Sequence, residues 1–211
     1  MRMTIDNKLL YICIPGTRSQ WIWECLGEQL ISDINKLGEN FDNPSWMMKN
    51  GKKRNEWPPH INNVNASASC KLLRNSYLKI TTVRNPWERY VSLYEVIKRD
   101  PQHQMYQIAI EGGFTGFISS IATGRSTFDL APQANWLFNN RAALDFDHIF
   151  KFEEPEKIQS FFIDRGYNFK NVATTSKPRD LSLYYKASTL GIVESLSWFD
   201  CTFFGYKRPV L

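Results

Sequence analysis

The sequence predicts an α/β protein, because short apolar segments with the composition of strands run directly into segments with the periodicity of helices. Residues 78–83 are apolar and β-branched, and a helix signal begins at Asn85. Residues 8–14 form a second apolar segment, which a short polar loop and another helical pattern follow. Strands that alternate with helices in this way are typical of a layered α/β fold.

Length and composition favour one globular domain that spans residues 1–211. Hydrophobic residues make up 43% of the chain and aromatic residues 14%, and no linker-like segment divides it. No apolar run reaches the length of about 18 residues that a bilayer-spanning helix needs. The start of the chain also lacks an apolar leader, so we expect no membrane segment and a cytoplasmic location.

Charge and cysteine content narrow the possible partners. A net charge of +5 favours anionic ligands, among them nucleotides and nucleic acid. Charge is the only feature that favours nucleic acid, so we expect no nucleic-acid partner. The cysteines are scattered without metal-ligand spacing, which predicts reduced core residues and no metal site. They are Cys13, Cys25, Cys70 and Cys201.

The first strand–loop–helix unit begins with the strand predicted within residues 8–14. Residues 15–20 form the loop, and an amphipathic helical pattern continues to residue 37. Either Thr17 or Ser19 could cap this helix, and Gly38 would end it. Backbone N–H groups at such a helix start point toward any anion that lies over the loop.

The second unit carries the clearest local signals in the chain. The strand at residues 78–83 is followed by Arg84, and Asn85 has the side chain of an N-cap. Pro86 suits the first helical position, where its missing N–H costs nothing. Glu88, three residues after Asn85, completes a capping-box pattern.

Arg84 and Ser92 allow two interpretations of this helix start. In the first, the guanidinium, the hydroxyl and the helix N–H groups together bind a phosphate, because Ser92 lies about two turns after the cap on the same helix face. In the second, Arg84 pairs with a core carboxylate and the helix merely tolerates Ser92. The residues alone leave both interpretations open.

Helical patterns fill much of the second half of the chain. Residues 101–122 predict one or two helices with a break at a Gly pair. Residues 147–152 predict a strand, and residues 155–165 predict a helix that Gly166 ends. The segment around Gln133 is interpreted as packing.

Residues 83–94 resemble the 3′-phosphate-binding motif of the carbohydrate sulfotransferase family, which includes heparan and dermatan sulfotransferases and their bacterial and viral relatives. The step of eight residues from Arg84 to Ser92 is the specific part of the match. The resemblance implies that these two residues hold the 3′-phosphate of the sulfate donor, 3′-phosphoadenosine 5′-phosphosulfate (PAPS). It also implies a P-loop-like α/β fold with three layers, in which helices flank a mainly parallel central sheet.

Residues 15–20 resemble the loop that binds the 5′-phosphosulfate in this family. Pro15, Thr17, Ser19 and the Trp21 that follows fit its pattern. Gly16 stands where the family has Lys, and Arg18 where it has a small residue. The resemblance assigns donor binding to the whole loop, which consists of Pro15, Gly16, Thr17, Arg18, Ser19 and Gln20. Arg18 is then the candidate that stabilises the leaving phosphate in place of the Lys. The alternative is a loop that binds nucleotide without accelerating transfer.

His60 is the candidate for the base that accepts the acceptor's proton, a role that suits a neutral imidazole. It lies 24 positions before Arg84, similar to the place where many relatives carry a His that in some of them is the base. Other relatives use a Glu, which makes Glu39 the second candidate. Near the end of the chain, Lys177 or Arg179 is expected to contact donor phosphate, because this segment resembles the loop that closes over the nucleotide.

The resemblance implies transfer of a sulfuryl group from PAPS to an acceptor hydroxyl, with a carbohydrate as the acceptor and no metal. The product nucleotide is adenosine 3′,5′-bisphosphate (PAP). One alternative is a catalytically impaired homologue that binds nucleotide. A P-loop kinase-like phosphotransferase is a second alternative, although the Walker pattern is absent from the sequence.

Overall fold

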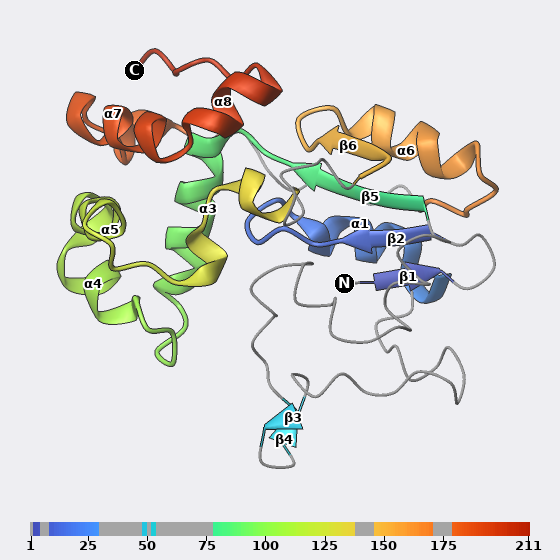
Figure 1. Ribbon diagram of the computed structural model, residues 1–211, viewed down its shortest axis with the longest axis horizontal. Coiled ribbons are helices and arrows are strands. Elements are labelled where there is room, and N and C mark those ends of the chain that lie inside the picture. The colour runs from blue at the N-terminus through green and yellow to red at the C-terminus, as the bar shows by residue number, and fades with distance from the viewer. Residues whose placement is uncertain are drawn as a thin grey trace.

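A four-stranded sheet forms the centre of one half of the molecule. The computed structural model describes residues 2–4, 9–29, 48–49, 52–53, 78–137, 146–170 and 179–211. The sheet contains β1 (Arg2–Thr4), β2 (Leu9–Ile12), β5 (Leu78–Val83) and β6 (His148–Lys151), in the order β1-β2-β5-β6. β2, β5 and β6 run parallel, and β1 is an antiparallel edge strand (Figure 1). A separate antiparallel pair consists of β3 (Met48–Lys49) and β4 (Lys52–Lys53).

β5 is the central parallel strand, and this position explains its composition. It pairs with β2 on one side and β6 on the other, so that Thr81 lies opposite both Ile12 and Ile149. Its last four residues are buried, as expected for a β-branched apolar strand with neighbours on both sides. Because the three strands are parallel, their carboxyl ends meet at one edge of the sheet.

Helices α1 (Ser19–Leu26) and α6 (Pro155–Ile163) pack with the strands in one hydrophobic cluster. Their apolar side chains contact Tyr11 of β2 and Ile80 of β5 there. Near the carboxyl edge, a second cluster joins Ile14 and Val83 to Trp136 and Phe204, which lie on η6 (Gln133–Trp136) and α8 (Trp198–Phe204). These elements confirm the predicted α/β class, a mainly parallel sheet flanked by helices.

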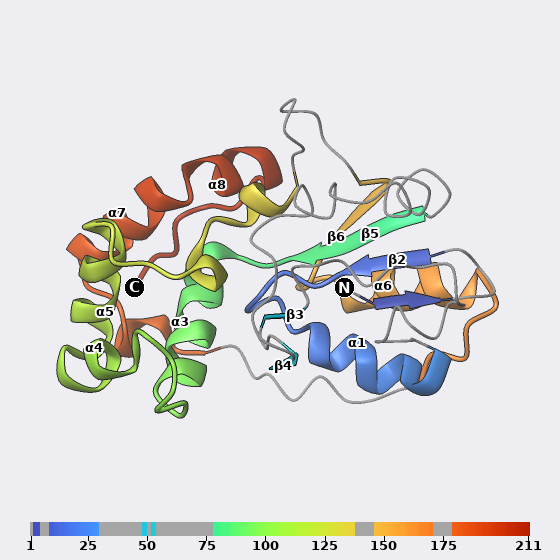
Figure 2. The same cartoon turned by 60° about the horizontal axis from the view of Figure 1, so that its bottom comes forward.

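The other helices form a second half of the molecule beyond the carboxyl edge of the sheet (Figure 2). α3 (Pro86–Ile97) continues from β5 into this half, where Trp87 and Tyr90 are fully buried. The indole Nε1 of Trp87 donates to the carbonyl of Leu190 at 3.2 Å, which joins α3 to α7 (Ala187–Leu196). The elements of this half, besides α8 and η6, are α3 (Pro86–Ile97), α4 (Tyr106–Glu111), α5 (Gly113–Ala122), η5 (Phe128–Leu130), η7 (Leu181–Leu183) and α7 (Ala187–Leu196).

The strand–helix junction at Asn85 is confirmed in detail. β5 has the predicted bounds, and the Asn85 side chain accepts hydrogen bonds from the N–H groups of Trp87 at 3.1 Å and Glu88 at 3.4 Å. Pro86 occupies the first helical position. The predicted break between two helices also occurs, because Gly113 begins α5 with a positive φ of 59°.

Three local predictions around the first loop and the α3 start are wrong. The first α-helix ends at Leu26 rather than before Gly38, because Gly27 takes a positive φ of 54°, and η1 (Gly27–Gln29) follows. Neither Thr17 nor Ser19 caps it: the residue before the helix is Arg18, without a capping side-chain bond. Glu88 does not complete a capping box, since it pairs with Arg84 instead.

Within the described residues, no helix combines the length and the apolar composition that crossing a membrane requires. The residues that lie outside the described ranges include three predicted site residues, His60, Glu39 and Lys177.

Candidate functional site

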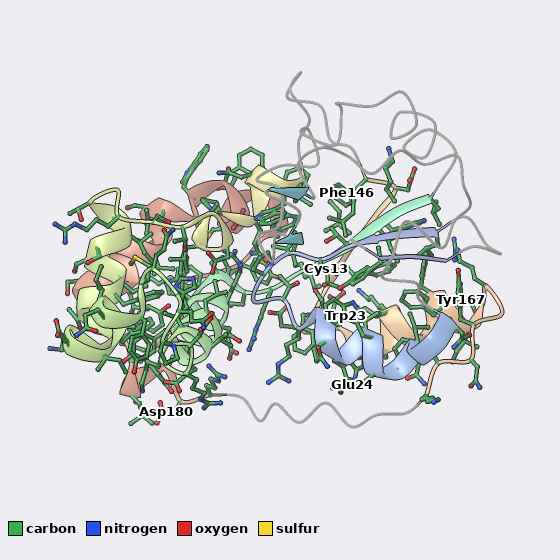
Figure 3. The ribbon with its side chains drawn as sticks, turned by 90° about the horizontal axis from the view of Figure 1, so that it is seen from below. Cys13, Trp23, Glu24, Phe146, Tyr167 and Asp180 are labelled. Atoms are coloured by element: carbon green, nitrogen blue, oxygen red, sulfur yellow. The ribbon has the colours of Figure 1, made fainter. Side chains whose placement is uncertain are left out.

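Three connections meet at the carboxyl edge of the parallel strands. They are the first loop after β2, the turn into α3 after β5, and the turn into α6 after β6. Cys13, at the start of the first loop, lies where the sheet adjoins the helical half (Figure 3). In open α/β sheets ligands bind at this edge, so these connections form the candidate site.

Arg84 stands at the centre of these connections. Its Nη2 forms an ion pair of 2.6 Å with Glu88 Oε2, and its Nη1 lies 3.5 Å from the Gly16 carbonyl. Only 3% of the Arg84 side chain is exposed. Burial lowers the pKa of Arg84, and the neighbouring Glu88 opposes this shift. Since an arginine pKa starts far above neutrality, Arg84 stays positively charged.

The Phe152 ring lies beside two arginines of the site. The guanidinium carbons of Arg18 and Arg84 lie 5.2 Å and 5.5 Å from the ring centroid. Phe152 is itself buried and follows β6 directly. An aromatic face attracts a cation and leaves its N–H groups available for an anion.

Arg18, Arg84 and Arg179 lie close enough for their charges to interact. Burial is the largest cause that lowers the pKa of Arg18, and the positive charges of Arg84 and Arg179 lower it further. The charge of Arg179 also lowers the pKa of Arg84. Within the described residues, the buried Nη1 of Arg179 has no hydrogen-bond partner. The site is therefore electropositive and holds a guanidinium with unused donor capacity.

The first loop keeps its shape through buried hydroxyl groups. Thr17 Oγ1 donates to the Ile14 carbonyl at 2.8 Å and lies 3.2 Å from Thr82 Oγ1 on β5. Tyr11 OH lies 2.7 Å from the same Thr82 hydroxyl and donates to Ser19 Oγ at 3.5 Å. The Thr17 side chain is fully buried, so its hydroxyl contributes to the loop conformation rather than to an exposed binding surface.

Gly16 has no room for a side chain. Its φ is 82°, in the left-handed region that L side chains rarely adopt. A Cβ there would lie 2.9 Å from Arg89 Cγ and 2.9 Å from Leu93 Cγ. The structure thus gives a physical reason why this chain carries Gly at a position where the resemblance leads one to expect Lys.

A buried network that the sequence analysis missed holds the backbone of Arg84. Gln133 Oε1 accepts from the Arg84 N–H at 2.8 Å, and Asp200 accepts from the Gln133 and Ala134 N–H groups at 2.8 Å and 2.7 Å. Gln133 and Asp200 are fully buried. The sequence favours a packing role for Gln133, and no local pattern indicates a bond to Arg84, which lies 49 residues away.

The remaining predicted residues are distributed as follows. Ser92 is half-buried on α3, four residues after Glu88 and therefore on the same helix face. Gln20 is exposed at the start of α1, where its Nε2 donates to Glu24 Oε1 at 3.2 Å. The Pro15 carbonyl accepts a hydrogen bond from Arg89. The structure thus brings the loop residues and Arg84 together.

No group of three His, Cys, Asp or Glu side chains suited to hold a metal ion occurs within the parts of the chain that the structure describes. The guanidinium groups of Arg18, Arg84 and Arg179 converge on the site beside the carboxylates of Glu88 and Glu153, and guanidinium groups bind anions. The arrangement is thus suited to a phosphate or a sulfate ester.

Comparison with protein families matches residues 2–189 to the sulfotransferase family. The match includes the first loop, the segment from Arg84 to Ser92 and the strands that position them. No match was found among curated proteins or among solved structures. Because the family match covers most of the 211 residues, the chain belongs to the sulfotransferase family.

Proposed function

We propose that the protein transfers a sulfuryl group from PAPS to an acceptor hydroxyl and releases PAP. The family supplies the reaction class, sulfuryl transfer. The observation that carries the choice of donor is the convergence of Arg18, Arg84 and Arg179 beside the first loop. Guanidinium groups that repel one another are stabilised by a ligand with several negative charges, and PAPS carries phosphates at two positions.

Each half of the donor has its own set of residues in this proposal. Arg84 and Ser92, on the strand end and the first turns of α3, hold the 3′-phosphate. Residues 15–20 hold the 5′-phosphosulfate, with the N–H groups at the start of α1 as further donors. No side chain caps the start of α1, and the Trp21 N–H donates to the Arg18 carbonyl at 3.0 Å, so the donors proposed here are the N–H groups of Ser19 and Gln20.

Arg18 is the residue proposed to stabilise the negative charge of the leaving group. Because Gly16 cannot carry the Lys of the family pattern, another cation must face the 5′-phosphate. Arg18 is half-buried in a left-handed conformation with φ of 58°, directly before α1. In the proposed reaction the acceptor oxygen forms a bond to sulfur while the bond from sulfur to the 5′-phosphate oxygen breaks. Arg18 stabilises the negative charge that builds on that phosphate.

The acceptor's proton goes to a base in the proposed reaction. His60 is the first candidate and Glu39 the second, and both lie outside the described residues. Lys177, also outside them, is proposed to contact donor phosphate together with Arg179. Substitution of His60 by Ala should abolish most turnover while leaving PAP binding intact. Normal turnover in His60→Ala would transfer the role of base to another residue.

A carbohydrate hydroxyl is the proposed acceptor, on the basis of the resemblance of residues 83–94 to the carbohydrate sulfotransferases. The second candidate function is a homologue that binds PAP or PAPS without transfer. The absence of room for a side chain at Gly16 favours this candidate specifically, since it excludes the family's Lys. Turnover therefore has to be measured separately from binding.

Calorimetric titration with PAP, with adenosine 5′-monophosphate and ATP plus magnesium as controls, tests the donor. We expect selective binding of PAP. Preference for ATP with magnesium, or absence of binding to all three, would overturn the proposal and favour a kinase-like or unrelated ligand. Labelled PAPS and a panel of carbohydrate and non-carbohydrate hydroxyl acceptors then test transfer. Selective PAP binding without turnover on any acceptor would favour the binding homologue.

A further inference from the structure

Arg89 is a fully buried cation on α3 whose side chain ends on the first loop. Its Nε donates to the Pro15 carbonyl at 2.8 Å, and its Nη2 donates to the Asp129 carbonyl at 2.8 Å. Its guanidinium carbon lies 5.7 Å from the centroid of the Tyr90 ring. A buried guanidinium is costly unless its N–H groups are paired, so these bonds hold the Pro15 carbonyl firmly against α3.

The stem of Arg89 also determines the conformation available at position 16. Arg89 Cγ and Leu93 Cγ would each lie 2.9 Å from a Cβ at Gly16, a distance that such atoms do not tolerate. α3 therefore contacts the loop in two independent ways, through a hydrogen bond to Pro15 and through close packing on Gly16.

The planar peptide between Pro15 and Gly16 links the direction of the Pro15 carbonyl to the direction of the Gly16 N–H. The peptide between Pro15 and Gly16 is trans, and the C=O and N–H of a planar trans peptide point in opposite directions. A Pro15 carbonyl that faces Arg89 therefore makes the Gly16 N–H point away from α3. Arg84 Nη1 lies 3.5 Å from the next carbonyl, that of Gly16, so two arginines of one helix start face two successive loop carbonyls.

We propose that Arg89 is a positioning residue for the 5′-phosphate half of the donor site. By holding the Pro15 carbonyl, it orients the Gly16 N–H and, through the loop that follows, the N–H groups of residues 18–20 toward the 5′-phosphate of the nucleotide. Arg89 lies between Arg84 and Ser92 on the helix that binds the 3′-phosphate, so it also sets the spacing between the two phosphate sites. This inference deepens the proposed function and rests on it.

The affinity ratio between PAP and adenosine 3′-monophosphate measures the contribution of the 5′-phosphate alone. In Arg89→Met, which keeps an apolar stem but loses both hydrogen bonds, we expect this ratio to fall by about tenfold, the equivalent of one charge-assisted hydrogen bond. Arg89→Lys keeps the charge and can reach one of the two carbonyls, so it should recover part of the ratio. A purely structural role for Arg89 would reduce the affinity for both nucleotides equally.

Arg99→Met is the matched control, because Arg99 follows α3 and 79% of its side chain is exposed. It should leave the ratio unchanged. Gly16→Ala disturbs the packing between the loop and Arg89 and leaves the buried charge in place. It provides the test if the Arg89 variants do not fold. Gly16→Ala should lower the ratio as Arg89→Met does. An unchanged ratio in folded Arg89→Met, or in Gly16→Ala, would overturn the inference.

Amide hydrogen exchange of residues 13–18 tests the positioning without a ligand. Exchange there should be faster in Arg89→Lys than in the wild type, and unaltered in Arg99→Lys. If the wild type does not prefer PAP, the proposed function fails, and exchange still decides whether Arg89 orders the loop. If the wild type prefers PAP but neither the ratio nor the exchange changes in the Arg89 variants, the inference alone fails.

Discussion

The side-chain amide of Gln133 binds both backbone polar groups of Arg84. Gln133 Oε1 accepts from the Arg84 N–H at 2.8 Å, and Gln133 Nε2 donates to the Arg84 carbonyl at 2.8 Å. Gln133 is in turn held by Asp200, which accepts from its backbone N–H at 2.8 Å. Side chains from two distant segments therefore determine where the chain leaves β5 and in which direction Arg84 points.

Gln133→Met tests how much this network contributes to the free energy of unfolding. The substitution keeps similar volume but leaves the N–H and carbonyl of Arg84 buried without partners, so the free energy of unfolding should fall by about 3 kcal/mol. Urea unfolding measures this change. Gln107→Met is the control, because Gln107 is exposed on α4. If the two variants lose equal stability, the Gln133 bonds contribute nothing particular to the fold.

Arg84→Ala should separate the two phosphates of the nucleotide. Loss of a buried guanidinium that binds the 3′-phosphate should weaken PAP binding at least about tenfold more than binding of adenosine 5′-monophosphate. Calorimetric titration of both nucleotides measures the difference, and Arg99→Ala is the matched control. Equal losses for both nucleotides would show that Arg84 does not bind the 3′-phosphate.

Glu88→Gln should strengthen PAP binding. Glu88 forms the ion pair of 2.6 Å with Arg84, and its carboxylate would repel an incoming phosphate. The amide keeps one acceptor oxygen for Arg84 but removes the negative charge, so we expect an increase in affinity of about fivefold at low salt.

Glu95→Gln is the control for this change. Glu95 is also on α3, but it pairs with Lys98 and Arg99 at 3.6 Å each, at the far end of the helix. It should leave PAP affinity unaltered. A weaker affinity in Glu88→Gln would show that the carboxylate orients Arg84 for the ligand rather than competing with the phosphate.

Arg18→Ala should reduce turnover more than it reduces binding. If Arg18 stabilises the charge that develops on the leaving phosphate, kcat should fall by about 100-fold while PAP affinity changes much less. Labelled PAPS with an active acceptor provides kcat, and calorimetry provides the affinity. Arg125→Ala, in an exposed turn after α5, is the control. Intact turnover in Arg18→Ala would leave the leaving-group role to another cation.

Local sequence signals predicted the elements that carry the site more reliably than the contacts within it. The junction from β5 to α3 follows from a β-branched segment, an Asn cap and a Pro at the first helical position, all within nine residues of sequence. The first helix was predicted to be too long, because an amphipathic pattern continues beyond Gly27 although its backbone takes a positive φ there. Tertiary context overrides periodicity at such a position.

Glu88 shows that a local sequence pattern does not predict which acceptor binds a donor when two acceptors compete for it. The capping-box pattern was present, but the N–H of Asn85 is bound by Glu153 Oε1 at 2.6 Å from the turn after β6. Glu88 is then available for the buried charge of Arg84, which binds a carboxylate more strongly than a neutral N–H does. The sequence contains both carboxylates, but it does not show which of them binds the Asn85 N–H and which binds Arg84.

The sequence alone predicts the α/β class, the central strand and the helix start, and it contains the Arg84 to Ser92 spacing that resembles a phosphate-binding motif. These follow from patterns within a few residues, where the chain's own geometry decides what lies next to what. The roles of His60, Glu39 and Lys177 stay predictions, as do those of Arg84, Ser92 and the loop at residues 15–20. The hydrogen bond from Arg89 to the Pro15 carbonyl, 74 residues away, and the lack of space for a side chain at Gly16 are visible only in the folded chain. Such contacts depend on which groups are buried together, and burial is a property of the whole fold.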